Sequence, residues 1–342
     1  MKATAIAPAN IAFIKYWGKK NRELRLPLND SISMNLSACL TTTTVDFSKK
    51  YKKDEVILLL DSGQVLRSRG SQDRGARMTK YENKENQRVI RHLNLIRKIG
   101  KINLLAKVVS TNSFPKSAGI ASSASGFAAL TVAGCAAAGL RLTEKELTIL
   151  ARLGSGSACR SVPDGFVEWK YGEDSNNSYA YSLYPDNYWD LRDTIVLVSD
   201  KAKKTSSNEG MENIWTSPLM EKRLKEIPGR LKKIKLALKE KNFSLLGTTC
   251  EEDCFSMHKV ANTQKPPIFY WTDKTEKIIE QVKSWRRNGL EVYFTIDAGP
   301  NVHLLCESKN EAKVISAVKQ FDSKLKYIIN KPTQGARIIN DS

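Results

Sequence analysis

Runs of aliphatic and β-branched residues predict most of the strands of this chain. The clearest runs, each bounded by polar or turn-forming residues, are 41–47, 55–60, 104–110, 166–171 and 193–200. We expect the lysine-rich stretch between the first two runs to form the tip of a hairpin. A strand at 291–299 and an antiparallel partner at 301–308 are also predicted.

The first twenty residues combine apolar positions with one proline. We expect a short strand that breaks at Pro8 and a turn that holds Asn10. An apolar run then follows, and it ends at Tyr16, Trp17 and a pair of lysines. The segment is therefore predicted as two short pieces rather than one strand.

Apolar residues at helical spacing predict the helices. They share one face between residues 83 and 98, and Thr143 with Glu146 forms a capping box for a helix that stops at Gly154. Further helices are expected within 217–260, 275–288 and 310–321. Strands and helices mix without strict β-α-β alternation, which favours an α+β fold.

The chain is long enough for two domains. Its 342 residues, of which 41% are apolar, can fill two cores. We expect an N-terminal domain over residues 1–190 and a C-terminal domain over 191–342. No internal repeat is found.

Three kinds of sequence feature bear on the expected compartment: a membrane span, a secretory signal and a disulfide scaffold. The uncharged stretch between Lys116 and Arg141 consists mostly of Ala, Gly and Ser, so we predict a buried helix rather than a membrane span. No secretory signal precedes Lys15, and six cysteines are too sparse for a disulfide scaffold. A reducing cytoplasm is expected.

The charge of the chain narrows the choice of partners. Lys and Arg number 55 against 36 Asp and Glu, a formal charge of +19. Such an excess suits nucleic acid, an anionic membrane or small, highly anionic substrates. The basic runs 49–53 and 230–241 match no recognised nucleic-acid-binding module, and we interpret them as solvated faces.

Four short segments carry residues suited to anions or to acid–base chemistry. PKSAGIASSASG offers small residues at a helix start, which favours phosphate, although Walker A and dinucleotide-binding spacings are absent. GSGSACRS offers serines and an arginine, KYWGKK offers lysines around two aromatic residues, and TIDAGPNVH places Asp297 at a strand end. Each also fits an ordinary turn or packed helix start. Their coincidence in one basic chain favours a site.

A different cluster imitates a metal site. Cys250, Cys254 and His258 recur every four residues on one predicted helix. Residues eight apart on a helix are separated by about 12 Å, so all three cannot bind one zinc ion. We predict that this stripe faces the core.

Six ordered segments resemble the diphosphomevalonate decarboxylase family of the GHMP kinase superfamily. They are APANIAFIKYWGK, NSFPKSAGIASSASGFAAL, GSGSACRS, VSDKAKKTSSNEGM, PPIFYWTD and TIDAGPNVH. The resemblance implies an α+β, two-domain GHMP-kinase fold, with an N-terminal domain like ribosomal protein S5 domain 2 and a ferredoxin-like C-terminal α/β sandwich.

The resemblance also implies an activity. It is the ATP- and Mg²⁺-dependent decarboxylation of mevalonate 5-diphosphate to isopentenyl diphosphate, CO₂, ADP and phosphate, in isoprenoid biosynthesis, by a cytoplasmic homodimer. No nucleic-acid or membrane partner is implied. The alternatives are a decarboxylase of mevalonate 5-phosphate or 3,5-bisphosphomevalonate, or a mevalonate 3-kinase of the same fold.

Roles for individual residues come from the same resemblance. Asp297 would orient or deprotonate the substrate hydroxyl, Lys15 would pair with Asp297, Arg160 would hold the substrate carboxylate and Ser123 would serve the phosphates. The implied substrate-binding residues are Asn10, Tyr16, Trp17, Gly18, Lys19, Ser155, Gly156, Ser157, Ala158, Cys159, Arg160 and Asn208. The implied ATP-binding residues are Pro115, Lys116, Ser117, Ala118, Gly119, Ile120, Ala121, Ser122, Ser123, Ala124 and Ser207. No metal ligand is assigned.

One position departs from the family pattern. Glu85 falls where the family carries an Arg or Lys toward the diphosphate of the substrate. Lys84 and Arg88 are the candidate replacements, and the 5-substituent of the substrate stays open between monophosphate and diphosphate. The kinase-only relatives lack the set of Asp297, Lys15 and Arg160, so its presence favours decarboxylation.

Overall fold

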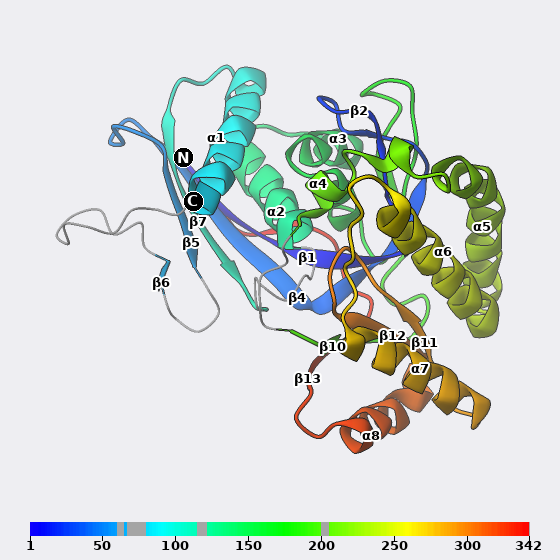
Figure 1. Ribbon diagram of the computed structural model, residues 1–342. Helices are drawn as coiled ribbons and strands as arrows, with labels where there is room; N and C mark the ends of the chain where they lie inside the picture. Colours follow the sequence, from blue (N-terminus) through cyan, green and yellow to red (C-terminus); the bar gives the residue numbers. More distant parts are fainter. Residues whose placement is uncertain (60–64, 67–79, 115–121, 200–204, 342) are drawn as a thin grey trace.

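An eight-stranded sheet and a four-stranded sheet, each covered by helices, form the body of the computed structural model (Figure 1). Residues 1–59, 65–66, 80–114, 122–199 and 205–341 are described. Both sheets are accompanied by helices without regular β-α-β alternation. The predicted α+β class is confirmed.

The larger sheet runs in the order β14–β1–β4–β7–β5–β6, and β8 joins β4 to β9. Its strands are β1 (Lys2–Ile14), β4 (Ser31–Ser48), β5 (Glu55–Leu59), β6 (Val65–Leu66), β7 (Leu105–Asn112), β8 (Phe166–Trp169), β9 (Ala180–Tyr184) and β14 (Arg337–Asp341). Because β14 pairs with β1, the two ends of the chain lie side by side (Figure 1).

Strand β1 passes through Pro8 without a break, so the predicted break and the predicted turn at Asn10 are wrong. The pairing of β1 with β4 shifts register between Pro8 and Asn10, which is a β-bulge. Proline is tolerated at a bulge because no ladder hydrogen bond is required there. Ala7 packs in one hydrophobic core and Ala9 in the other. The bulge therefore lets one strand contribute buried side chains to both cores.

The predicted hairpin between residues 41–47 and 55–60 is also wrong. Strand β7 lies between β4 and β5, antiparallel to β4 and parallel to β5. Asp54 holds the connection in place, since its carboxylate accepts hydrogen bonds from the Ala106 amide at 2.8 Å and the Arg97 guanidinium at 3.0 Å. These contacts come from distant segments, which local sequence does not reveal.

Three helices cover one side of the larger sheet (Figure 1). They are α1 (Lys80–Gly100), α2 (Ser122–Ala137) and α3 (Glu144–Gly154). The predicted capping box of α3 is confirmed, with Thr143 and Glu146 exchanging hydrogen bonds. The small residues of α2 let it pack closely on β1 and β4. No described helix is long and apolar enough to cross a membrane.

The smaller sheet is antiparallel and runs in the order β11–β12–β10–β13. Its strands are β10 (Leu191–Leu197), β11 (Tyr293–Thr295), β12 (Val302–Glu307) and β13 (Lys326–Asn330). The helices of this part are α5 (Met220–Glu240), α6 (Phe243–Thr263), α7 (Asp273–Arg287) and α8 (Glu311–Phe321). The predicted antiparallel pairing of 291–299 with 301–308 is confirmed by β11 and β12.

Short elements connect these layers. They are β2 (Lys19–Asn21), β3 (Leu26–Pro27), α4 (Ser207–Gly210) and the 3₁₀ turns Gly156–Ser161, Ile214–Thr216 and Ser308–Asn310. Residues 67–79, a polar stretch of the sequence, lie outside the described residues, and α1 begins at Lys80. The domain boundary near residue 190 stays a prediction.

Helix α6 packs between β1 and β11 and brings the two sheets together. Cys250, Cys254 and His258 all lie on its buried side, at most 2% exposed. His258 contacts the carbonyl oxygen of Ile296, and burial lowers the pKa of its imidazole to about 3. No group of three metal-binding side chains occurs among the described residues. The prediction that this stripe faces the core is confirmed.

The same helix carries a buried ion pair. Asp253 and Arg223 of α5 have fully buried side chains 3.0 Å apart. We expect Asp253→Ala to lower the free energy of unfolding by about 3–5 kcal/mol, because it leaves the Arg223 charge buried without its carboxylate. Lys233→Gln, which breaks an exposed pair with Glu252, should cost under about 1 kcal/mol. Chemical denaturation measures both, and equally small losses would contradict the expectation.

Candidate functional site

A lysine–aspartate pair lies where β1 ends and the chain leaves β11. The Lys15 ammonium donates to Asp297 Oδ1 at 2.6 Å, and the side chains are 2% and 29% exposed. Lys15 immediately follows β1, and Asp297 lies two residues beyond β11. The pair therefore connects the two sheets at a point that still reaches solvent through the carboxylate.

The backbone of Lys15 is fixed by the buried ion pair of α5 and α6. Its amide donates to Asp253 Oδ2 at 2.7 Å, and Arg223 Nη2 donates to its carbonyl at 3.3 Å. Both polar groups of the Lys15 backbone are thus satisfied by one ion pair. This arrangement fixes the backbone from which the Lys15 side chain reaches Asp297.

Both members of the pair are charged at neutral pH. Burial is the largest influence and works to lower the pKa of Lys15, but the charge and hydrogen bond of Asp297, with smaller contributions from Cys254 and Cys250, together raise it. Burial is the largest influence and works to raise the pKa of Asp297, but the charge and hydrogen bond of Lys15, with contributions from His303 and Arg160, together lower it. Asp297 is therefore an ionised carboxylate beside a fixed cation.

Arg160 supplies a second buried cation. It lies in the 3₁₀ turn that follows α3, and it is 3% exposed. Its guanidinium donates to Ser31 Oγ at 2.5 Å, Ser33 Oγ at 3.1 Å and Asn10 Oδ1 at 3.2 Å. These partners are neutral, and burial lowers the pKa of Arg160. A buried guanidinium whose described hydrogen-bond partners are all neutral oxygens is suited to bind an anion.

Serine and asparagine side chains hold the loop around Arg160. Asn10 donates from Nδ2 to Ser161 Oγ at 2.8 Å and to the Ser157 carbonyl at 3.2 Å. Ser123, in the first turn of α2, lies 3.2 Å from Ser155 in hydroxyl-to-hydroxyl contact. The predicted phosphate and substrate segments therefore meet at Ser123 and Ser155.

Lys19 and Asn208, both in the predicted substrate-binding set, contact each other. Lys19 Nζ donates to Asn208 Oδ1 at 2.9 Å. Burial, followed by the charge of Arg25, lowers the pKa of Lys19 to about 8. Tyr16 lies nearby, with its ring 4.6 Å from that of Trp169 and its hydroxyl without a hydrogen-bond partner among the described residues.

Other residues of the predicted substrate set serve as packing in the structure. Trp17 packs edge to face on Tyr270 at 6.0 Å, and Gly18 has φ +123°, where a side chain would be strained. Ala158 and Cys159 are fully buried in two hydrophobic clusters. Gly156 has no room for a Cβ, which would lie 2.7 Å from the Tyr16 ring. These residues shape the site rather than point polar groups into it.

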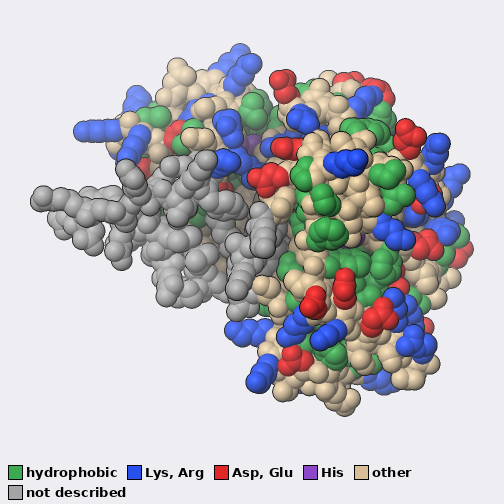
Figure 2. Space-filling model, in the orientation of Figure 1, with side chains coloured by type: hydrophobic (Ala, Val, Ile, Leu, Met, Phe, Trp, Pro, Cys, Tyr) green, Lys and Arg blue, Asp and Glu red, His purple; other side chains and the backbone are tan. Residues whose placement is uncertain are grey.

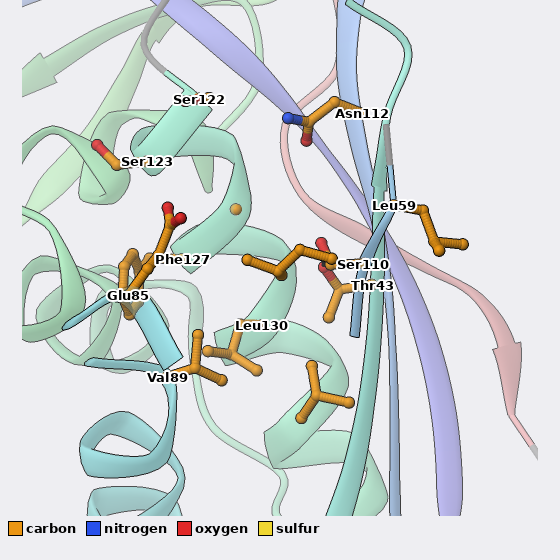
Figure 3. Close-up of a pocket in the computed structure, with 13 residues that line it drawn as sticks. Thr43, Leu59, Glu85, Val89, Ser110, Asn112, Ser122, Ser123, Phe127 and Leu130 are labelled. Atoms are coloured by element: carbon orange, nitrogen blue, oxygen red, sulfur yellow. Dashed lines mark hydrogen bonds between the residues drawn. The ribbon is translucent and has the colours of Figure 1, made fainter. Parts of the chain in front are cut away.

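A partly apolar pocket opens beside the first turn of α2 (Figure 3). Val89 comes from α1, Phe127 and Leu130 come from α2, and Ser110 and Asn112 come from β7. Ser122, Ser123 and Glu85 also line it. The pocket thus joins an apolar wall to the serines of the predicted phosphate segment.

The predicted ATP-binding residues fall into three groups. Residues 115–121 lie outside the described residues. Ser122, Ser123 and Ala124 form the first turn of α2, and Ala124 is fully buried. Ser207 is the first residue of α4, and the preceding Ser206 caps that helix together with Glu209.

The structure separates Lys84 and Arg88, the two candidates for the basic role that Glu85 cannot fill. Lys84 is exposed. Arg88 Nη2 donates to the Gly154 carbonyl at 3.1 Å, and its guanidinium lies 4.9 Å from the Phe127 ring centre. Of the two, Arg88 is the one in contact with the start of the GSGSACRS segment.

Sequence reasoning missed three charged residues of the site: Asp253, Arg223 and Arg25. Asp253 carried no specific signal, because it is one of three consecutive acidic residues, 251–253, between Cys250 and Cys254. Arg223 and Arg25 also carried no signal in the sequence, since arginine is common in a chain this basic. Their roles follow only from tertiary contacts.

Comparison with known proteins gives the same picture along the whole chain. Residues 7–180 match the diphosphomevalonate decarboxylase-like N-terminal domain, and residues 194–338 match the mevalonate 5-diphosphate decarboxylase C-terminal domain. The diphosphomevalonate decarboxylase of Debaryomyces hansenii is 35% identical, over 94% of this chain and 84% of the relative. That of Candida albicans is 35% identical, over 99% and 95%.

Solved structures agree with these sequence matches. A structure of MDDEF in complex with MVAPP, AMPPCP and magnesium has a TM-score of 0.89 and 35% identity, covering 100% of this chain and 99% of that one. The mevalonate diphosphate decarboxylase from Enterococcus faecalis has a TM-score of 0.88 and 35% identity, with the same coverage. The predicted two-domain GHMP-kinase fold is thereby confirmed at the level of the family. The chain belongs to the diphosphomevalonate decarboxylase family.

Proposed function

We propose that this protein decarboxylates mevalonate 5-diphosphate in an ATP-dependent reaction that yields isopentenyl diphosphate, CO₂, ADP and phosphate. The observation that carries the proposal is the buried Lys15–Asp297 pair together with the buried Arg160. The family relationship supports the same reaction.

The first step transfers the γ-phosphoryl group of ATP to the 3-hydroxyl oxygen of the substrate. In our proposal the hydroxyl donates a hydrogen bond to Asp297, which accepts the proton as the new P–O bond forms. Lys15 keeps Asp297 ionised and offsets negative charge on the transferring group. A carboxylate with a lowered pKa is a weak base, so it serves best when the proton moves late.

The second step breaks two bonds and forms one double bond. The 3-phosphate leaves with the electron pair of its C–O bond, and the C–C bond to the carboxylate supplies electrons for the alkene as CO₂ departs. Arg160 would orient that carboxylate through its planar guanidinium. The neutral partners of Arg160 hold it in place without neutralising it.

ATP is proposed to bind in the pocket beside α2. The apolar side chains Val89, Phe127 and Leu130 would contact the base, while Ser110 and Asn112 offer hydrogen bonds to it. The free amides at the start of α2 favour phosphate. Ser123 would contribute its hydroxyl to the transferring phosphate.

Mg²⁺ fits this site as a companion of the nucleotide. The described residues hold no cluster of three metal-binding side chains, and magnesium in phosphotransfer sites is often held by phosphates and one or two protein oxygens. Asp297 and Ser123 are the described oxygen donors suited to this. When bound, the ion would neutralise phosphate charge.

The excess charge of the protein does not require a nucleic-acid partner. Figure 2 shows lysine and arginine side chains interspersed with acidic ones on the visible face, including its right-hand edge, where α5 lies in Figure 1. In the 230–241 run, Lys233 pairs with Glu252 at 3.6 Å and Lys235 with Glu168 at 2.7 Å. We propose an enzyme of small anionic substrates.

The compartment and the assembly are also proposals. All six cysteines are free and buried, which supports the reducing cytoplasm. We propose a homodimer from the family resemblance, and a domain division near residue 190, which lies between the two family matches at residues 7–180 and 194–338.

The products of one turnover test the proposed reaction. With mevalonate 5-diphosphate, ATP and Mg²⁺, CO₂ and ADP should form in equal amounts. Parallel reactions with mevalonate 5-phosphate, 3,5-bisphosphomevalonate without ATP, and mevalonate distinguish the alternatives. ADP release without CO₂ from every substrate would overturn decarboxylation and favour the 3-kinase.

Lys19 makes substrate capture pH-dependent. Its ammonium should lose its proton as the pH passes about 8, which removes a charge from the site and lowers kcat/KM for the substrate. Lys19→Arg should move this decline to higher pH, because arginine stays protonated. A decline at the same pH in the variant would assign the titration to another group.

A further inference from the structure

Two cations converge on one neutral oxygen at the edge of the site. Lys19 Nζ lies 2.9 Å from Asn208 Oδ1, and Arg25 Nη1 lies 3.5 Å from the same atom. Like charges this close repel each other. An anionic acceptor would relieve this repulsion, whereas the neutral amide oxygen of Asn208 cannot.

The backbone of Arg25 holds its side chain in this position. Its φ is +51°, in the left-handed region that long side chains rarely adopt. Its Nε donates to the Leu153 carbonyl at 2.9 Å, at the end of α3. The strained backbone of Arg25 and its hydrogen bond to Leu153 of α3 together hold the guanidinium next to Asn208.

Both cations line an open cavity of about 450 Å³. Arg25, Lys19 and Asn208 contribute to its wall, and among the described residues Glu212 is the one acidic side chain that lines it. The cavity therefore presents net positive charge to a ligand.

An unpartnered hydroxyl gives an independent sign of a missing ligand. Tyr16 Oη is buried and makes no hydrogen bond to a described residue. Burial raises the pKa of Tyr16, and the charges of Arg25 and Arg160 act against it. Tyr16 is thus a buried hydrogen-bond donor beside Gly156 with no acceptor in the described part of the chain.

We infer that Arg25 is a specificity-determining residue that binds the terminal phosphate of the 5-diphosphate of the substrate, together with Lys19 and the Tyr16 hydroxyl. Arg25 would take over the task of the basic residue that Glu85 replaces. The inference rests on the proposed function, because it names the end of that same substrate. It predicts selection for a 5-diphosphate over a 5-monophosphate, which lacks the terminal phosphate.

Two variants separate charge from fold. Arg25→Asn removes the charge, and asparagine tolerates the left-handed backbone. Arg25→Lys keeps the charge without the planar guanidinium. As a matched control, Arg141→Gln removes one exposed arginine in the loop before Thr143, at the end of α3 remote from Gly154.

Steady-state kinetics with both substrates provide the main measurement. Arg25→Asn should raise KM for mevalonate 5-diphosphate by about tenfold to a hundredfold, because a charge-assisted hydrogen bond is lost. KM for ATP and for mevalonate 5-phosphate should stay within about threefold, so selectivity falls. Arg25→Lys should lie between, and Arg141→Gln should match the parent protein.

A binding measurement keeps the inference separate from the proposed reaction. Inorganic pyrophosphate, titrated calorimetrically into the parent protein, should bind more tightly than into Arg25→Asn. If the parent protein binds pyrophosphate through Arg25 but releases no CO₂, the proposed reaction fails and the inference about the anion stands. If Arg25→Asn is folded and leaves both KM and pyrophosphate affinity unchanged, the inference is overturned.

Discussion

The ion pair of Lys15 and Asp297 is the constraint on which the rest of the site depends. It joins the end of a strand in one sheet to the end of a strand in the other, at 2.6 Å. Burying such charges is expensive unless each has its partner and its hydrogen bonds. A second buried pair, Asp253 and Arg223, satisfies the backbone amide and carbonyl of Lys15. Chemistry and domain packing are therefore coupled.

Around this pair the structure places cations whose partners are mostly neutral. Arg160 is held by Ser31, Ser33 and Asn10, and Lys19 is held by Asn208. Neutral partners fix geometry without cancelling charge, so the field remains available to phosphates and a carboxylate. The arrangement leaves protein cations close together, and burial with the nearby charge of Arg25 lowers the pKa of Lys19. Substrate binding would relieve this repulsion.

Local patterns predicted the elements well and their pairing less well. The capping box at Thr143 and the antiparallel pair β11–β12 depend on neighbours in sequence, and both were predictable. The insertion of β7 between β4 and β5 depends on long-range pairing, and the bulge at Pro8 depends on two cores. Among site residues, the motif-borne Lys15, Asp297 and Arg160 were named in advance. Arg25 and Arg223 acquire meaning only from distant contacts, such as those with Leu153 and Asp253.

A double-mutant cycle on Lys15 and Asp297 tests the central claim most directly. Lys15→Met and Asp297→Asn should each lower kcat by at least about a hundredfold, with nucleotide affinity retained as a check of folding. If the two residues act as one unit, the double variant should lose no more than the worse single variant, within about threefold. Losses that multiply in the double variant would show that the residues act independently, and would contradict the account.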